Sequence, residues 1–223
     1  MAGQQKPQTL RIGSVAPDFE ADSTEGRIRF YDYIGDDWAL LFFIPDDFTP
    51  VATTELVIFA YLQREFAERN VKFVVVSTQN RPSSDGGHVP HSEWLKDINE
   101  IYPNPDPHAV RFPLVTDADG KLSYLYDILD MKDVQNLNAT DDVTTGKAFK
   151  SRTLFIVGPL WESKHHIRMT FNYPAAVGFN IPEVFRGLGA LQVSDAACVR
   201  TPANWVPGGD VVVPPLMPEA EAM

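Results

Sequence analysis

Two continuous apolar runs joined by a helical pattern constrain the fold of this chain most. The first run is Ala39–Pro45 and the second is Val71–Ser77. Short apolar runs without alternation are typical of strands that are buried on both faces, as in parallel sheets. Across residues 52–69, apolar residues recur at helical spacing, at Leu56, Phe59, Ala60, Leu62 and Phe66. That spacing predicts a helix, so the segment is expected to form a strand–helix–strand unit.

The rest of the chain continues this mixture of strands and helices. We expect helices over residues 91–101, 121–129 and 181–193, and strands over residues 110–116, 153–157 and 166–171. The last two strands flank a Gly-Pro turn and are predicted to form an antiparallel hairpin. Residues 130–150 are polar and irregular, which indicates a loop, and an arm rich in proline, glycine and valine begins at Thr201. The predicted fold class is α/β, with a central mixed sheet flanked by helices.

Composition excludes several classes of function. The 223-residue chain has a formal net charge of −11, which disfavours nucleic acid or an anionic membrane as its main partner. The first ten residues contain no apolar run of signal-peptide length, and the strongest apolar runs are too short to span a bilayer. We therefore expect a soluble, cytoplasmic protein, with organelle targeting left open. The single cysteine, Cys198, excludes an internal disulfide and a multi-cysteine zinc site, and no cofactor is expected.

The segment after the first apolar run carries the most chemical information. It reads Pro45-Asp-Asp-Phe-Thr-Pro-Val-Ala-Thr-Thr-Glu-Leu56. Thr49 is predicted to precede the helix and Pro50 to begin it, where a missing N–H costs nothing. Ala52 then lies in the first turn, where unpaired N–H groups and the helix dipole favour an anion. A cysteine there would be a good nucleophile, whereas alanine keeps the backbone and removes the nucleophile.

This segment resembles the peroxiredoxin signature Phe-Thr-Pro-Val-Cys-Thr-Thr-Glu, with Ala52 in the place of the cysteine. Further segments resemble the one-cysteine, bifunctional subgroup: Gly13–Phe19, Gly26–Phe30, Trp94–Ile98, Tyr173-Pro174 and Thr201–Trp205. The resemblance implies a thioredoxin-like domain over residues 1–174 and a C-terminal extension over residues 175–223. It also implies that the extension helps two copies form a homodimer.

The resemblance identifies site residues and three departures from the family pattern. Thr49, Pro50 and Arg152 match the pattern, but Ala52 replaces the cysteine. Ile44 and Phe179 stand where the subgroup usually has a histidine and an arginine. Because three site positions are apolar together, we favour a natural loss of peroxidase chemistry.

The bifunctional subgroup also carries a lipase-like motif, which this chain lacks. The corresponding segment is Gly35–Ala39, with Asp37 in the place of the serine. Tyr31 and Leu160 stand where the resemblance implies a histidine and an aspartate. A phospholipase needs a nucleophile and a base, so this activity is excluded.

These observations favour a repurposed, non-redox enzyme that acts on a small, partly aromatic oxyanion, as in natural-product biosynthesis. Thr49 and Arg152 would stabilise the anion, and Asp47 or His91 would move a proton during isomerisation or cyclisation. The predicted small-molecule pocket is lined by Phe43, Ile44, Pro45, Phe48, Pro50, Val51, Ala52, Glu55 and Phe179.

Two alternatives stay open at this level. One is a non-catalytic pseudoenzyme that binds a ligand or a partner, and the other is an engineered Cys-to-Ala variant of a working one-cysteine thiol peroxidase. Individual residues also have structural interpretations. Arg152 could serve only as an ion-pair partner of Glu55, and His91 could be a structural residue. Cys198 is expected to be a partly buried residue at a helix end.

Overall fold

The computed structural model describes residues 9–78, 83–84, 86–87, 89–101, 110–131, 134–135, 151–160 and 164–214. The chain falls into two compact units, Met1–Phe179 and Asn180–Met223. The boundary expected from the sequence, between residues 174 and 175, precedes this division by a few residues. Among the described residues, no helix is both long enough and apolar enough to cross a bilayer.

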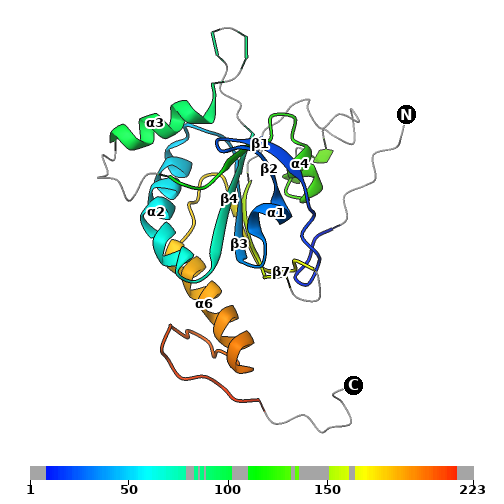
Figure 1. The fold of residues 1–223 in the computed structure, drawn as a ribbon, viewed down its shortest axis with the longest axis vertical. Helices are drawn as coiled ribbons and strands as arrows, with labels where there is room; N and C mark the ends of the chain where they lie inside the picture. Colours follow the sequence, from blue (N-terminus) through cyan, green and yellow to red (C-terminus); the bar gives the residue numbers. More distant parts are fainter. Residues whose placement is uncertain are drawn as a thin grey trace. The chain divides into compact units, whose positions relative to one another are not determined.

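The first unit is built on a seven-stranded sheet (Figure 1). Its strands are β1 (Glu20–Ser23), β2 (Gly26–Arg29), β3 (Trp38–Ile44), β4 (Val71–Ser77), β5 (Leu114–Thr116), β6 (Ser151–Val157) and β7 (Ile167–Pro174). Their order across the sheet is β2-β1-β5-β4-β3-β6-β7. The β3–β4 and β4–β5 pairs are parallel, whereas the other pairs are antiparallel. The predictions of a mixed sheet and of an antiparallel β6–β7 pair are therefore confirmed.

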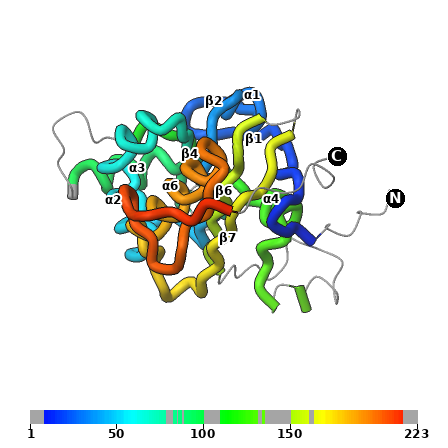
Figure 2. Tube along the Cα trace, turned by 90° about the horizontal axis from the view of Figure 1, so that it is seen from below, coloured from blue at the N-terminus to red at the C-terminus, as the bar shows by residue number. Residues whose placement is uncertain are grey.

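Helices cover both faces of this sheet. They are α1 (Phe30–Ile34), α2 (Pro50–Ala67), α3 (His91–Ile101) and α4 (Lys121–Leu125). Figure 1 shows α2 and α3 on one side of the sheet and α1 and α4 on the other. Figure 2, turned by 90°, also separates α2 and α3 from α4. The predicted flanking of the sheet by helices is confirmed.

The first apolar run forms β3, whose seven residues are all buried. Successive side chains of a strand point to opposite faces, so β3 contributes to both layers of the core. Leu41 and Phe43 belong to a cluster that includes Phe30 of α1. Phe42 instead packs edge-on against Phe59 of α2, with 5.6 Å between the ring centroids. This double burial explains why β3 shows no polar alternation.

The ends of several elements differ from the prediction. β5 has three residues instead of seven, and α4 ends at Leu125. The hairpin of β1 and β2 was not predicted because its short strands are largely exposed and carry no apolar pattern. Most of residues 130–150 lie outside the described residues. Met131, Val134 and Gln135 are helical, so the loop prediction is wrong at its start.

The second unit consists of α6 (Ile181–Ala197) and the segment that follows it. The Asn180 side chain caps α6 by accepting a hydrogen bond from a backbone N–H of its first turn at 3.3 Å. α6 ends at Ala197, and Cys198 caps its carboxyl end with a left-handed φ of 51°. Among the described residues after α6, regular pairing is limited to a bridge between Arg200 and Val212, in agreement with the predicted arm.

Candidate functional site

The candidate site forms where β3 ends and α2 begins. Asp47 is buried in the connecting loop, and Phe48 adopts a left-handed backbone with φ of 57°. Thr49 precedes α2 in an extended conformation and Pro50 begins the helix, as predicted. The Thr49 side chain does not cap α2, and its hydroxyl donates to the Asp46 carbonyl at 3.2 Å. The first N–H groups of α2 are therefore left for another acceptor.

Ala52 occupies the first turn of α2 and has no exposed surface. Ile44 and Pro45, at the end of β3 and just after it, are also buried, and Val51 is half-buried. A methyl group has no lone pair or exchangeable proton, so this position cannot supply a nucleophile. Any chemistry at this site depends on the groups around Ala52.

Arg152 and Glu55 form a buried ion pair beside this position. Arg152 lies on β6, which pairs with β3, and only 1% of its surface is exposed. Its Nη1 donates to Glu55 Oε2 at 2.5 Å, and its Nη2 donates to the Ala175 carbonyl at 2.6 Å. Arg152 Nε is buried without a hydrogen-bond partner in the described structure. Glu55 follows Ala52 by three residues, so both lie on one face of α2.

The Glu55 carboxylate also links α2 to the segment after β7. Its Oε1 accepts a hydrogen bond from the Phe179 backbone N–H at 2.8 Å. Burial raises the pKa of Glu55, whereas the Phe179 N–H and Arg152 act in the opposite direction. A Cβ at Gly178 would lie 3.3 Å from Val51 Cγ1, so glycine permits this close approach to α2.

Aromatic rings close the site on the side of the sheet. Phe179 is 8% exposed, and its ring lies 5.1 Å from Phe42 and 4.8 Å from Tyr173. Phe43, which the sequence analysis assigned to the pocket, packs against Tyr126 and Phe155 instead. The alternation of side chains along β3 sends Phe43 to the opposite face and brings Phe42 to the site.

Asp47 and His91 form a second buried cluster. Asp47 Oδ2 lies 2.5 Å from His91 Nδ1, and His91 Nε2 lies 3.0 Å from Thr116 Oγ1. Asp47 Oδ1 is buried and has no hydrogen-bond partner in the described structure. This arrangement connects the loop before α2, the start of α3 and the end of β5. Thr116 was not predicted as a site residue, because no sequence motif includes it.

The start of α3 is also bonded to α2. Trp94 Nε1 donates to Thr53 Oγ1 at 3.0 Å, and the Phe48 ring lies 6.1 Å from the Trp94 ring. The structure therefore places the predicted site residues in two clusters. Arg152, Glu55 and Phe179 surround the helix face of Ala52, and Asp47 pairs with His91.

The positions of the lipase-like motif have structural partners. Asp37 forms an ion pair with Lys72 at 3.3 Å, and the Tyr31 hydroxyl donates to the Ala16 carbonyl at 2.5 Å. Leu160 is 43% exposed. None of these three side chains is a serine, cysteine or histidine, so the arrangement offers no nucleophile–base pair.

The single cysteine of the chain belongs to the second unit. Cys198 lies at the end of α6 as predicted but is exposed, so the expectation of partial burial is wrong. Among the described residues, no group of three or more His, Cys, Asp or Glu side chains could hold a metal ion.

Comparison with known protein families shows to which family this chain belongs. The sequence model of the AhpC/TSA family matches residues 12–162, and that of the C-terminal domain of 1-Cys peroxiredoxin matches residues 190–222. The chain belongs to the peroxiredoxin family. It is similar to the yeast mitochondrial peroxiredoxin PRX1, with 42% identity over 96% of this chain and 74% of the relative. It is also similar to human peroxiredoxin-6, with 38% identity over 97% of this chain and 88% of the relative.

Solved peroxiredoxin structures share the fold. The yeast mitochondrial 1-Cys peroxiredoxin superposes with a TM-score of 0.74 at 39% identity, covering 92% of this chain and 87% of that one. The peroxiredoxin 6 of Arenicola marina gives 0.74 at 31% identity, covering 96% and 87%. The thioredoxin-like fold with a C-terminal extension is therefore confirmed. Because the yeast relative is named as mitochondrial, the expected cytoplasmic location stays a prediction.

Proposed function

We propose that this chain is a one-cysteine peroxiredoxin scaffold that retains the framework of a peroxide site but lacks its nucleophile. The single observation that carries the proposal is the buried Arg152–Glu55–Phe179 network on the helix face of Ala52. The sequence analysis favoured a repurposed enzyme. The similarity to peroxiredoxins supports the present proposal better than it supports that enzyme. As it stands, the protein does not reduce peroxides through this site.

Thiol chemistry is not expected at this site, because no cysteine lies at the start of α2. A thiol peroxidase requires a thiolate, and the amino-terminal turn of a helix stabilises one. Here that turn carries Ala52, and the one cysteine of the chain, Cys198, lies at the carboxyl-terminal end of α6. A helix end of that polarity does not stabilise an anion, so Cys198 is a poor substitute for the missing nucleophile.

Restoring the thiol tests this proposal. We expect the Ala52→Cys variant, made in a Cys198→Ser background, to consume hydrogen peroxide with a small thiol as the reductant. Ala52→Ser in the same background is the matched control, because it has similar size and no thiol. Peroxide loss would be followed in a stopped-flow assay. Equal rates for the two variants would show that Ile44, Phe179 and their surroundings no longer support peroxidase chemistry.

A second candidate function is binding or non-redox turnover of a small oxyanion at the same place. Arg152 Nε favours it, because this buried donor has no hydrogen-bond partner in the described structure. The uncapped start of α2 would add N–H donors from Val51 and Ala52. The Asp47–His91 pair would supply the acid or base.

Thermal-shift measurements with small carboxylates and phenolates test this second function. A ligand at 100 times its dissociation constant stabilises the folded state by about 2.7 kcal/mol, which is readily seen. The ligand-dependent shift should disappear in Arg152→Gln, provided that this variant is folded in circular dichroism. If no compound stabilises the parent protein, the site is not an oxyanion pocket.

We also propose that the protein is a homodimer whose second unit contributes to the contact. Val206, Val212 and Val213 support this, because they are 59%, 52% and 76% exposed in the second unit. Apolar groups gathered on an exposed segment commonly mark protein contacts. Light scattering of the full chain should give twice the mass of 24.9 kDa. The double variant V206D/V212D should give the monomer mass, and a parent monomer would contradict the proposal.

A further inference from the structure

The buried pair of Asp47 and His91 continues to a hydroxyl group. His91 Nδ1 lies 2.5 Å from Asp47 Oδ2, and His91 Nε2 lies 3.0 Å from Thr116 Oγ1. A carboxylate, an imidazole and a hydroxyl in this order have the arrangement of a catalytic triad, in which the imidazole activates the hydroxyl and the carboxylate orients the imidazole. Such a triad is recognised by its geometry and not by the positions of its residues in the sequence.

The three residues meet at one edge of the sheet. β3, β4 and β5 are neighbours and run parallel. Asp47 lies in the loop that follows β3, His91 begins α3, and Thr116 is the last residue of β5. The end of β5 is fixed, because the Asp117 backbone N–H donates to the Ser77 carbonyl at 2.8 Å. In open α/β sheets, ligands commonly bind at the carboxyl ends of parallel strands.

The hydrogen bonds set the positions of the protons in this cluster. An ionised Asp47 can only accept, so His91 Nδ1–H donates to it. The lone pair of a neutral His91 then lies on Nε2, and Thr116 Oγ1 donates its proton to that atom. His91 is therefore held in the tautomer that can act as a base toward the Thr116 hydroxyl.

The Asp47 carboxylate is not saturated by other donors. Only 3% of Asp47 is exposed, and its Oδ1 has no hydrogen-bond partner in the described structure. The buried polar atoms of a purely structural network normally have partners. A carboxylate with a free oxygen keeps its charge for stabilising the imidazolium that forms when His91 takes a proton. The unpartnered oxygen therefore favours a chemical role for the cluster.

Thr116 also lines a cleft of about 660 Å³. It is half-buried, whereas Asp47 and His91 are buried. The cleft is formed by residues 116–119, by the start of α4 and by residues 20–22 of β1, together with Arg27. Its volume falls within the usual range of small-molecule sites, about 300–1,000 Å³. Thr116 is therefore the member of the cluster that borders a cleft.

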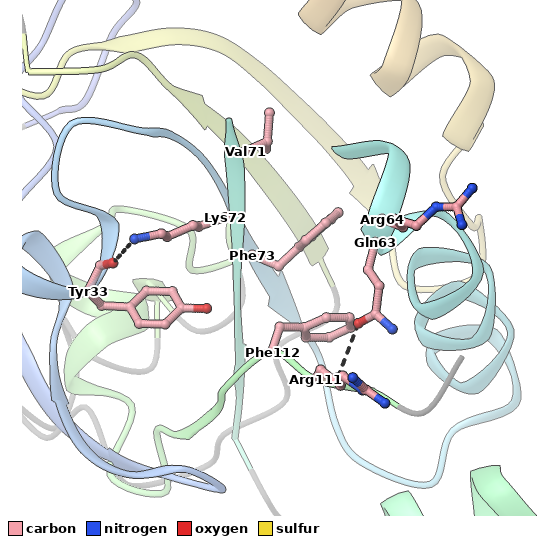
Figure 3. Close-up of a pocket in the computed structure, with 8 residues that line it drawn as sticks. All are labelled: Tyr33, Gln63, Arg64, Val71, Lys72, Phe73, Arg111 and Phe112. Atoms are coloured by element: carbon pink, nitrogen blue, oxygen red, sulfur yellow. Dashed lines mark hydrogen bonds between the residues drawn. The ribbon is translucent and has the colours of Figure 1, made fainter. Parts of the chain in front are cut away.

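Another cleft of the first unit lacks such a cluster. It opens near the start of β4, and Figure 3 shows Arg64, Lys72 and Arg111 around it. Its described lining contains no histidine, cysteine, serine or threonine, and its Phe73 and Phe112 rings belong to the buried core. The pairing of a hydroxyl with a histidine therefore distinguishes the cleft at Thr116.

We propose that Thr116 is the nucleophile of an acyl-transfer site that hydrolyses small carboxylic esters. The Thr116 oxygen attacks the carbonyl carbon of the ester while His91 Nε2 takes the hydroxyl proton. His91 gives this proton to the leaving alcohol as the bond between carbon and the alcohol oxygen breaks, and the acyl group stays on Thr116. A water molecule that loses its proton to His91 then attacks the acyl group. Return of that proton to the Thr116 oxygen releases the carboxylic acid.

The charge of the cleft narrows the class of ester. Its lining has four acidic and two basic side chains, so a neutral or cationic ester is favoured over an anionic one. The proposal goes beyond the function proposed for the region of Ala52, because no step uses Ala52, Arg152 or Glu55. It shares the Asp47–His91 pair with the second candidate function, so the experiment must separate an acyl group on Thr116 from proton transfer alone.

Hydrolysis of p-nitrophenyl acetate by the full chain tests the proposal. The Cys198→Ser background is used, because it removes the one thiol of the chain. We expect a burst of p-nitrophenolate, with the acetyl group located on Thr116 by mass spectrometry. The hemisuccinate ester of p-nitrophenol carries a carboxylate and should react more slowly. A faster reaction of the hemisuccinate would overturn the assigned class of ester.

Variants then identify the reacting groups. Thr116→Val and His91→Gln should each lose the burst and lower the rate about 100-fold, the usual lower limit for the contribution of a general base. Thr116→Ser should retain the burst, because it keeps the hydroxyl. Thr170→Val is the matched control, since Thr170 is exposed on β7 and lies outside the cluster. It should react as the parent protein does.

Three results would overturn the proposal. The first is a parent protein that hydrolyses the ester no faster than buffer, and the second is acetylation confined to lysine side chains. The third is an unchanged rate in Thr116→Val with a loss in His91→Gln, which would show that His91 activates water directly. Circular dichroism establishes that each variant is folded. If Thr116→Val or His91→Gln is not folded, the position of the acetyl group in the parent protein decides.

Discussion

Replacing Arg152 by leucine tests the central feature of the site, the buried ion pair with Glu55. The substitution removes the hydrogen bonds to Glu55 Oε2 and to the Ala175 carbonyl. Glu55 is 2% exposed and would retain only the Phe179 N–H as a partner among its observed contacts. Breaking one partner of a buried pair costs about 3–5 kcal/mol, because the other charge is left uncompensated. For a chain of this length, that loss lowers the melting temperature by roughly 6–20 °C.

The destabilisation should depend on pH, and the direction follows from Glu55. Burial already raises its pKa above the ordinary value of 4.5, and Arg152 opposes that rise. In Arg152→Leu the folded pKa therefore increases further. A carboxyl group with a raised folded pKa binds its proton more tightly in the folded state, so stability falls as pH rises from the unfolded value through the folded one. The loss relative to the parent protein should be larger at pH 8 than at pH 5.

Urea denaturation of the variant and the parent protein at both pH values measures this difference. The other titratable groups contribute equally to both proteins, so their effect on stability cancels in the comparison. The matched control is the double variant E55Q/R152L, in which the buried group is neutral but can still accept from the Phe179 N–H. It should lose less stability than Arg152→Leu and should show no added pH dependence. A loss below about 1 kcal/mol at pH 8 would refute the assigned role, because a buried uncompensated charge costs more than that. An equal loss at pH 5 and pH 8 would refute it as well.

Three further substitutions test the fold around the site. Leu41→Ala should lower the free energy of unfolding by about 2–5 kcal/mol in urea denaturation, because Leu41 has no exposed surface. The control Ile58→Ala, on the exposed side of α2, should change it by about 0.5 kcal/mol or less. His91→Leu should lower the free energy of unfolding by about 2–3 kcal/mol, because the Asp47 carboxylate loses its partner. The double variant with Asp47→Asn should recover part of this loss, because its buried group is neutral. Asn180→Ala should cost about 1 kcal/mol and speed amide exchange in the first turn of α6, whereas Asn180→Asp should preserve the cap.

The strands and helices that carry the site were largely predictable. The apolar runs that form β3 and β4 have a clear physical cause, since both strands lie in the middle of the sheet between two helix layers. The start of α2 was predictable because threonine and proline have strong positional preferences there. The hairpin of β1 and β2 escaped prediction, because exposed edge strands need no apolar pattern.

The composition of the site was only partly predictable. The Arg152–Glu55 pair was expected as one interpretation, and the structure confirms the contact. The role of the Ala175 carbonyl and the pairing of Thr116 with His91 were not expected. The first depends on the exact end of the β6–β7 hairpin, and the second depends on how the start of α3 meets the end of β5. Phe42 lies at the site in place of the predicted Phe43, because the Phe42 side of β3 is the one that faces α2.

The sequence alone determined that position 52 carries no thiol and that the chain resembles one-cysteine peroxiredoxins. Both conclusions rest on residue identity and local spacing, which do not require a fold. Only the tertiary structure decided that Ala52 is fully buried beside the paired Arg152 and Glu55. It also brought Asp47, His91 and Thr116 together beside one cleft. These arrangements depend on strand pairing and helix packing over long sequence separations, which no local pattern encodes.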